Sequence, residues 1–353
     1  MVSRLLRRSW WNWRLNINMS DFKINSIATK QGQHGPVIAG VSTVNSTGCM
    51  KIPSGPTEHR GGRGRGVIGS GLTIPASTQI KTLNLITIAT AGNAIDFGDL
   101  SYGNAYRGGL ASSTRGLFAN GQGDATYDYV TISSQGGVSD FGEATSNHMG
   151  GATFNSSTRG FRAGGADPSH TSNIMGMIIA STGSFFDAGD LTKVGTYQNG
   201  ASSPTRGIIF GGTTPSAEYN LIDVFTMASG GNATKFGELI TERKYADTAS
   251  NTIRALAAGG SQPSTLNSIE FVTIATEGNA TDFGDLHSAT STGKSGSVSS
   301  STRGIFSGFY PAQTARMDFV TIMSAGNAQD FGDMTATWYY HGGCSDSNGG
   351  IGE

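Results

Sequence analysis

Few residue sets in this chain have the types and spacing for chemistry, and the most conspicuous is the quartet Asp-Phe-Gly-Asp. In protein kinases, Asp-Phe-Gly holds magnesium and works with a glycine-rich phosphate loop, a strand lysine and a catalytic-loop partner. Those partners do not accompany it here, and the quartet recurs with small variations along the chain. A motif at equivalent positions in successive copies is typical of a scaffold, so we expect a structural role.

The paired acids of each quartet would also suit calcium. Calcium takes roughly six to eight oxygen ligands, whereas each quartet offers only two carboxylates close in sequence. We therefore expect the acids to bond nearby backbone groups, the glycine to permit a bend and the phenylalanine to pack between neighbouring copies. The third copy has Ala188 at this packing position, and the other copies have Phe97, Phe141, Phe236, Phe283 and Phe331.

A second recurring residue is the arginine that ends a small-residue segment, as in Ser-Ser-Thr-Arg-Gly. Six such arginines would form a positive ring if they faced solvent. A guanidinium at a turn more often satisfies carbonyl oxygens or pairs with a carboxylate such as Asp99, Asp285 or Asp333, and we expect this structural role. The six are Arg65, Arg115, Arg159, Arg206, Arg254 and Arg303.

Other candidates for catalysis are scattered. The six histidines form no Ser/His/Asp or Cys/His set, and Cys49 and Cys344 match no metal-binding spacing. We expect no enzyme, cofactor or metal site. The 24 basic and 25 acidic residues nearly balance, which argues against nucleic acid, and no apolar run approaches the roughly 18 to 20 residues of a membrane span.

The elements that must position these residues form a repeat. Successive arginine positions are 50, 44, 47, 48 and 49 residues apart, which gives six copies. Each copy offers four β-type segments, here named a to d; in the last copy they are 295–299, 304–308, 318–324 and 328–331. Four short strands in a repeat of about 40 to 50 residues predict an all-β, six-bladed β-propeller.

The two ends of the repeat array are incomplete in a complementary way. The first copy begins at a strand b, 66–69, while 339–347 reads as a strand a with no further strands behind it. We expect the C-terminal strand to pair with the N-terminal blade and to close the ring, because closure covers sheet edges that an open array leaves unpaired.

The connections between strands divide into uniform and variable ones. The a-to-b and c-to-d turns are nearly the same in every copy, whereas the b-to-c and d-to-a connections, which lie on the other face, differ. The variable connections mix aromatic with small polar residues, a composition that suits a recognition surface or a plug in the channel mouth. The candidate binding residues are Tyr106, His148, Tyr197, Tyr245, Tyr310, Trp338 and Tyr340, with Tyr102, Phe309 and Tyr339 beside them.

The N-terminal part does not repeat. Residues 1–18 are a basic and aromatic leader, read either as an anchor or as the product of a start codon upstream of Met19. Residues 19–56 alternate like short strands and end in a turn-rich linker, so we expect a β-rich appendage before the propeller of residues 57–353.

Two resemblances follow from these motifs. Strand b ending in Gly-Gly, as in Ile-Ile-Phe-Gly-Gly at 208–212, resembles the kelch motif, although kelch repeats carry tryptophan in strand d where this chain has phenylalanine. The start Met-Ser-Asp-Phe-Lys-Ile-Asn at 19–25, Gly-Pro-Val-Ile-Ala-Gly at 35–40, Arg-Gly-Gly-Arg-Gly-Arg-Gly at 60–66 and the repeats together resemble virion structural proteins of marine tailed phages, notably cyanophages.

The phage resemblance implies a place in the virus particle, as a tail or fibre appendage. It implies other virion proteins as partners, a host cell-surface glycan or protein as ligand, and self-association through residues 19–56. Two alternatives stay open: a kelch-like interaction module outside any virion, and a propeller-type glycan-binding or hydrolytic protein. The residues of a sialidase-like hydrolase or a copper oxidase cannot be assembled from any motif in this chain.

Overall fold

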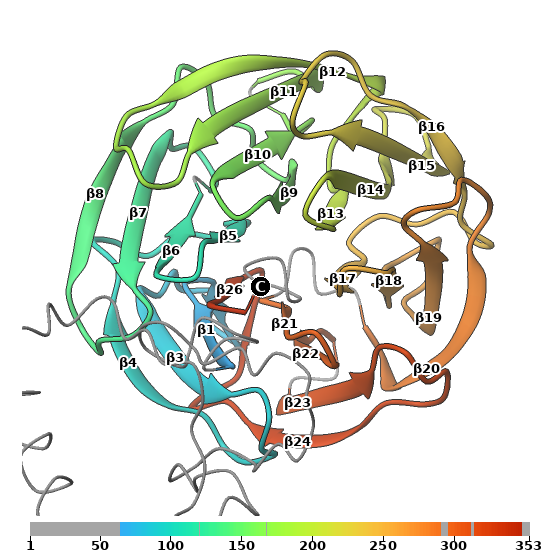
Figure 1. Cartoon of the computed structure of the whole chain (residues 1–353). Coiled ribbons are helices and arrows are strands. Elements are labelled where there is room, and N and C mark those ends of the chain that lie inside the picture. The colour runs from blue at the N-terminus through green and yellow to red at the C-terminus, as the bar shows by residue number, and fades with distance from the viewer. Residues whose placement is uncertain (1–63, 120, 167, 291–295, 312–313, 348–353) are drawn as a thin grey trace, which may run out of the picture. The chain divides into compact units, whose positions relative to one another are not determined.

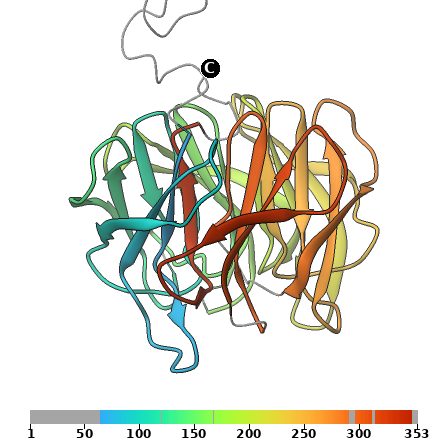
Figure 2. The same ribbon diagram turned by 90° about the horizontal axis from the view of Figure 1, so that it is seen from below.

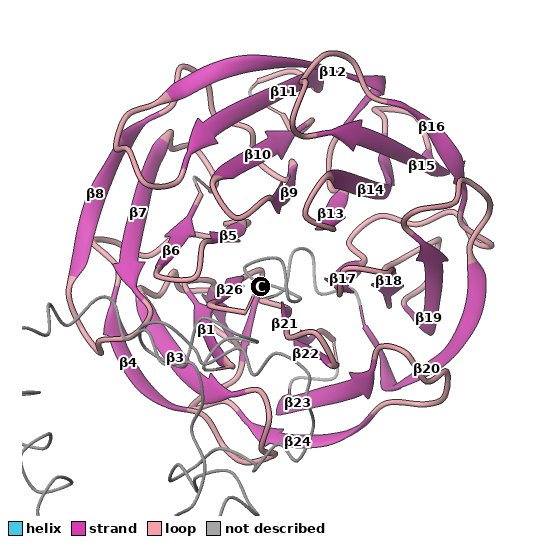
Figure 3. Ribbon diagram, in the orientation of Figure 1, coloured by secondary structure: helices cyan, strands magenta, loops and turns pink. Residues whose placement is uncertain are grey.

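The computed structural model describes residues 64–119, 121–166, 168–290, 296–311 and 314–347. All the regular secondary structure in these ranges is β-strand (Figure 3). Six four-stranded antiparallel sheets stand around a central channel (Figure 1), which confirms the predicted all-β, six-bladed propeller. Across these ranges no helix is long and apolar enough to span a membrane. The predicted leader and appendage, 1–18 and 19–56, lie outside the described residues.

Each blade places strand a at the channel and strand d at the rim. Blades 2 and 3 are formed by β5 (Gly109–Ala111), β6 (Arg115–Phe118), β7 (Thr126–Thr131), β8 (Val138–Glu143), β9 (Ala152–Asn155), β10 (Arg159–Ala163), β11 (Thr171–Ile178) and β12 (Phe185–Gly195). Blades 4 and 5 are formed by β13 (Asn199–Ser202), β14 (Arg206–Thr213), β15 (Glu218–Thr226), β16 (Thr234–Glu238), β17 (Asp247–Ser250), β18 (Arg254–Ala258), β19 (Leu266–Thr273) and β20 (Thr281–Thr290). Blade 6 is formed by β21 (Val298–Ser299), β22 (Arg303–Phe309), β23 (Thr314–Thr321) and β24 (Gln329–Asp333).

Blade 1 combines strands from both ends of the described chain. Its sheet has the order β26 (Gly342–Ser345), β1 (Arg65–Gly69), β3 (Thr82–Thr87) and β4 (Ile95–Asp99). β26 pairs antiparallel with β1, with Cys344 opposite Val67. A two-stranded ribbon of β2 (Leu72–Thr73) and β25 (Trp338–Tyr339) accompanies this blade.

Three predicted strands differ from the structure by more than two residues at one end. Of the predicted strand at 295–299, only Val298–Ser299 forms a strand, β21, and residue 295 lies outside the described residues. The predicted strand at 339–347 is divided into β25 and β26, because Tyr340 has a φ of 56°, a left-handed conformation that interrupts an extended strand. The predicted strand at 318–324 is β23 and begins earlier, at Thr314. Its β-like end is a turn, in which the Ser324 amide donates to the Thr321 carbonyl at 2.9 Å.

The hydrophobic core lies between blades. Six clusters of buried side chains each draw on two adjacent blades. Between blades 3 and 4 the Phe161 ring lies 5.4 Å from that of Phe154 and 5.1 Å from that of Phe225. The cluster that contains Ile68 and Ile305 joins blade 6 to blade 1. Since burial of apolar surface is the main stabilising term, each blade depends on its neighbours.

The quartet is one half of a joint between blades. The Phe97 carbonyl accepts a hydrogen bond of 2.7 Å from the amide of Gly136, in the c-to-d turn of the next blade. The same bond recurs around the ring and ends with Gly92 donating to Phe331 at 2.6 Å. In four joints the turn asparagine also accepts from the last quartet amide, as Asn93 does at 3.0 Å. The quartet and the Gly-Asn-Ala turn therefore form one structural unit.

The six repeat arginines connect the same pairs of blades. Arg65 donates through Nη1 to the carbonyls of Ile132 at 3.2 Å and Ser133 at 2.7 Å, at the end of strand c in the next blade. The series ends with Arg303, whose Nη1 reaches Ile88 of blade 1 at 3.2 Å. The acceptors are carbonyl oxygens, the first of the two structural roles considered for these residues. The other four arginines make equivalent bonds.

A matched pair of glycine substitutions tests the joint. A methyl group on Gly237 would overlap the Gly278 carbonyl of the next blade, whereas one on Gly92 meets nothing within 4 Å. Neither residue has a left-handed φ, so steric overlap is the difference between them. We expect Gly237→Ala to lower the free energy of unfolding by about 2 kcal/mol and Gly92→Ala by less than about 0.5 kcal/mol. Urea unfolding of both variants measures this difference. Equal losses of unfolding free energy in the two variants would contradict the close approach of Gly237 to the next blade.

Stability should also depend on His341, between Tyr340 and β26. Its imidazole is fully buried and its Nε2 lies 2.9 Å from Ser307 Oγ. Burial lowers the pKa of His341 to about 3, against about 6.5 in an unfolded chain, so folding favours the neutral ring. This contribution is complete above about pH 6.5 and is lost as the pH falls toward 3, by on the order of 1 kcal/mol per pH unit.

Urea unfolding at neutral pH and at about pH 4 measures this dependence. The difference in unfolding free energy between the two pH values should be smaller in His341→Gln than in the unmodified chain. The exposed His287→Gln serves as the control and should keep the full difference. An unchanged pH dependence in His341→Gln would show that other groups cause it.

Candidate binding site at the channel mouth

The connections of the ring fall on two faces. Seen from the side, the short a-to-b and c-to-d turns lie on one face and the b-to-c and d-to-a connections on the other, where the light-blue β1-to-β3 connection projects (Figure 2). The described chain begins at Gly64 and ends at Ser347, and the Asp346 amide donates to the Arg65 carbonyl at 3.1 Å. Both ends therefore lie together on the face of the short turns.

Four tyrosines occupy one equivalent position on the opposite face. Each lies two or three residues before strand a of its blade, and each has a left-handed φ between 56° and 61°. Blade 3 has Gly150 there, with a φ of 71°. We call these residues the tyrosine cluster: Tyr106, Tyr197, Tyr245 and Tyr340.

The rings of the tyrosine cluster close on one another around the channel axis. Ring centroids are 4.3 Å apart for Tyr106 and Tyr340, and also for Tyr197 and Tyr245. The two pairs meet at 5.7 Å between Tyr106 and Tyr197 and at 6.0 Å between Tyr245 and Tyr340. Tyr339 and Tyr310 continue the cluster outward at 4.5 and 4.9 Å.

The backbone fixes the tyrosine cluster in place. The Tyr106 amide donates to the Tyr340 carbonyl at 2.9 Å, and the Tyr245 amide donates to the Tyr197 carbonyl at 3.2 Å, each bond joining adjacent blades. A left-handed conformation costs a residue with a side chain on the order of 1 kcal/mol or more, and it persists only where the surroundings enforce it. The ring contacts and these hydrogen bonds provide that enforcement, so the four side chains are ordered before any ligand arrives.

Burial favours the neutral form of three phenols in the tyrosine cluster, because it raises the pKa of Tyr106, Tyr245 and Tyr340. The neighbouring phenols raise the pKa of Tyr106 and Tyr245 further, whereas the hydrogen bond between Tyr340 and Tyr106 opposes the rise at Tyr340. Beside them, Lys244 Nζ lies 2.7 Å from Glu218 and 5.6 Å from the Tyr245 ring centroid. The cluster offers aromatic surface and hydroxyl groups, which suit binding by stacking and hydrogen bonding.

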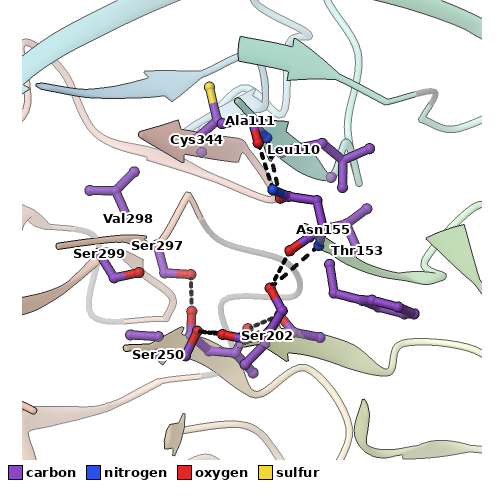
Figure 4. Close-up of a pocket in the computed structure, with 18 of the residues that line it drawn as sticks. Leu110, Ala111, Thr153, Asn155, Ser202, Ser250, Ser297, Val298, Ser299 and Cys344 are labelled. Atoms are coloured by element: carbon purple, nitrogen blue, oxygen red, sulfur yellow. Dashed lines mark hydrogen bonds between the residues drawn. The ribbon is translucent and has the colours of Figure 1, made fainter. Parts of the chain in front are cut away.

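The channel contains a polar collar. Ser250 Oγ donates to the Ser202 carbonyl at 2.9 Å, Ser202 Oγ to the Asn155 carbonyl at 2.9 Å, and Asn155 Nδ2 to the Ala111 carbonyl at 2.5 Å (Figure 4). Ser345 makes a similar bond between blades 1 and 6. The cavity measures about 60 Å³, room for a few waters.

Other predicted site residues lie in the interior. His148 is buried, with its ring 2.8 Å from the Gly164 carbonyl and 2.9 Å from Ser146 Oγ. Trp338 belongs to the core between blades 6 and 1, and Phe309 to the core between blades 5 and 6. These three side chains do not reach the face where the tyrosine cluster lies.

Three fully buried arginines, Arg107, Arg162 and Arg243, were not among the predicted site residues. They occupy different positions in their repeats, so a search for recurring residues passes over them. By contrast, Tyr106, Tyr197 and Tyr245 were predicted as site residues, and aligning the d-to-a connections would also have shown that they are equivalent, because each precedes strand a by nearly the same interval.

No family model and no curated protein matches the chain. Within the described ranges, no three or more His, Cys, Asp or Glu side chains gather where they would hold a metal ion. The first quartet acid instead accepts from its own glycine amide, as Asp140 does from Gly142 at 2.8 Å.

A spectroscopic titration tests the burial of these phenols. Burial raises the pKa of five of the ten tyrosines in the chain, namely Tyr106, Tyr127, Tyr219, Tyr245 and Tyr340. At about pH 10.5 the folded protein should lack the phenolate absorbance of at least these five, and unfolding in urea should restore it. Because their pKa is higher in the folded chain than in the unfolded chain, these neutral phenols contribute their full stability below about pH 10. That contribution is lost as the pH rises above about 10. Full absorbance with an intact circular dichroism spectrum would contradict the burial.

Proposed function

We propose that this protein is a non-catalytic component of a phage particle, a tail or fibre appendage, whose propeller binds a host cell-surface glycan through the tyrosine cluster. The observation that carries the proposal is the tyrosine cluster itself: four prearranged phenols on one face of the ring of blades. Prearranged aromatic side chains lose little conformational entropy on binding, which favours recognition.

The chemistry of the tyrosine cluster favours a sugar. A sugar presents apolar C–H faces and hydroxyl groups, and half-buried phenols offer aromatic surface and hydroxyl groups in return. Burial raises the pKa of Tyr106 and Tyr245, which opposes a role of these phenols as acid or nucleophile near neutral pH and supports binding without catalysis.

The position of the chain ends supports the appendage role. Gly64 and Ser347 lie on the face of the short turns, so both ends of the described chain lie on the face opposite the tyrosine cluster. We infer that residues 19–56 attach the protein to other virion proteins or to sister chains, while the tyrosine cluster binds the glycan.

Binding of the purified full-length chain to glycans from the host surface tests the recognition step. The double variant Tyr197→Ala/Tyr245→Ala should bind about tenfold more weakly or worse, because it removes one of the two pairs of rings in the tyrosine cluster whose centroids are 4.3 Å apart. Phe186→Ala, an exposed aromatic on the rim strand β12, is the control and should bind normally. Unchanged affinity in a folded double variant would rule out the cluster as the site.

Mass spectrometry of purified particles tests the virion role separately. The peptides of this chain should copurify with the particles of the phage that encodes it, and labelled antibodies should mark the tail or its fibres. Absence from clean particles would refute the virion role and leave glycan binding to be judged on its own.

A further inference from the structure

The interface between blades 2 and 3 departs from the repeat at two buried positions. Arg162 is the fourth residue of strand b, counted from the repeat arginine. The other five blades have Ile68, Phe118, Ile209, Ala257 and Phe306 there, all buried. Arg162 is also fully buried, so one charged side chain stands where the fold otherwise places an apolar one.

The second departure is Tyr127, the strand c residue opposite the quartet glycine. The register gives the equivalents in the other blades as Leu83, Ile174, Ile222, Ile269 and Met317. Tyr127 is fully buried and belongs to the core cluster between blades 2 and 3.

The repeat brings these two positions together. In each of the other five interfaces, the equivalents of Arg162 and Tyr127 belong to the same core cluster, as Ile209 and Ile174 do between blades 3 and 4. Arg162 and Tyr127 must therefore meet between blades 2 and 3, and the charge of one also affects the pKa of the other. Five of the six interfaces therefore have an apolar pair at these positions, and the interface between blades 2 and 3 has a polar pair.

In the part of the chain that the structure describes, the other two buried arginines each lie beside a carboxylate, whereas Arg162 does not. Arg243 is hydrogen-bonded to Glu270, and Arg107 Nη1 lies 3.8 Å from Asp128 Oδ2. Among the described residues Arg162 pairs with no carboxylate. Its Nε and Nη2 donate to the His148 carbonyl at 2.9 and 2.7 Å, and Nη2 lies 3.4 Å from the Tyr106 carbonyl.

Two polar groups at this place remain unused. Within the described part of the chain, Arg162 Nη1 and the Tyr127 hydroxyl have no hydrogen-bond partner. Although burial lowers the pKa of Arg162 to about 10, the guanidinium stays charged at neutral pH. A buried charge without a counter-charge is strongly destabilising, and two unused donors within the same interface between blades provide ligands for a negative ion.

We propose that Arg162 Nη1 and the Tyr127 hydroxyl bind a small monovalent anion of the size of chloride between blades 2 and 3. The anion takes the place that Glu270 and Asp128 fill for the other two arginines. Because Arg162 also donates to the carbonyl of Tyr106, the ion lies beneath one corner of the tyrosine cluster and helps to hold it.

Thermal unfolding of the full chain in sodium chloride and in sodium gluconate of equal ionic strength tests this proposal. Chloride should raise the unfolding temperature by about 2–4 °C relative to gluconate, because it binds only the folded state. The difference should vanish in Arg162→Met, which keeps the side-chain volume without the charge, and should shrink in Tyr127→Phe. Arg206→Met, at a repeat arginine of blade 4, should keep it.

A crystal grown in sodium bromide gives the direct reading, an anomalous peak beside Arg162 Nη1. Should Arg162→Met fail to fold, Tyr127→Phe and the bromide peak still decide the question. Equal unfolding temperatures of the unmodified chain in the two salts, or bromide data without a peak at Arg162, would overturn the proposal. Neither result depends on glycan binding, so this site and the proposed function can fail independently.

Discussion

The joint between neighbouring blades is the interaction on which the whole molecule depends. A quartet carbonyl accepts from the next blade's turn amide, a repeat arginine spans the same gap, and the apolar core lies between the two sheets. No blade encloses a core of its own, so none gains its burial energy until its neighbours are in place. Blades 6 and 1 are connected by the same kind of joint, so the last blade in the chain packs against the first as every other blade packs against its neighbour.

The fold could be predicted from the sequence because the structural motifs recur in the six copies of the repeat. The quartet, the turns and the strand order could be read as scaffold before any partner was known. The partners themselves could not, because the carbonyl that accepts from Arg65 lies 67 residues away, in another blade. Likewise, sequence does not distinguish Trp338, which is buried in the core, from Tyr340, which is half-buried at the channel mouth two residues later.

Departures from the repeat have two different meanings in this fold. In the d-to-a connections they alter a surface, and the tyrosine cluster arises where four copies have tyrosine and blade 3 has Gly150. At Arg162 and Tyr127 they alter the interior, where an apolar pair gives way to a charge and a hydroxyl. Surface variation is expected of any repeat protein, whereas buried polar variation is costly and persists where something compensates it.

The place of β1 within blade 1 has a mechanical consequence. β1 is flanked by β26 on one side and β3 on the other, and the described chain enters it at Gly64. Tension that arrives through Gly64 pulls β1 along its own axis against both neighbours, so its hydrogen bonds must break together instead of opening one at a time. Under such a load β1 would be sheared between β26 and β3, which requires more force than separating paired strands one hydrogen bond at a time.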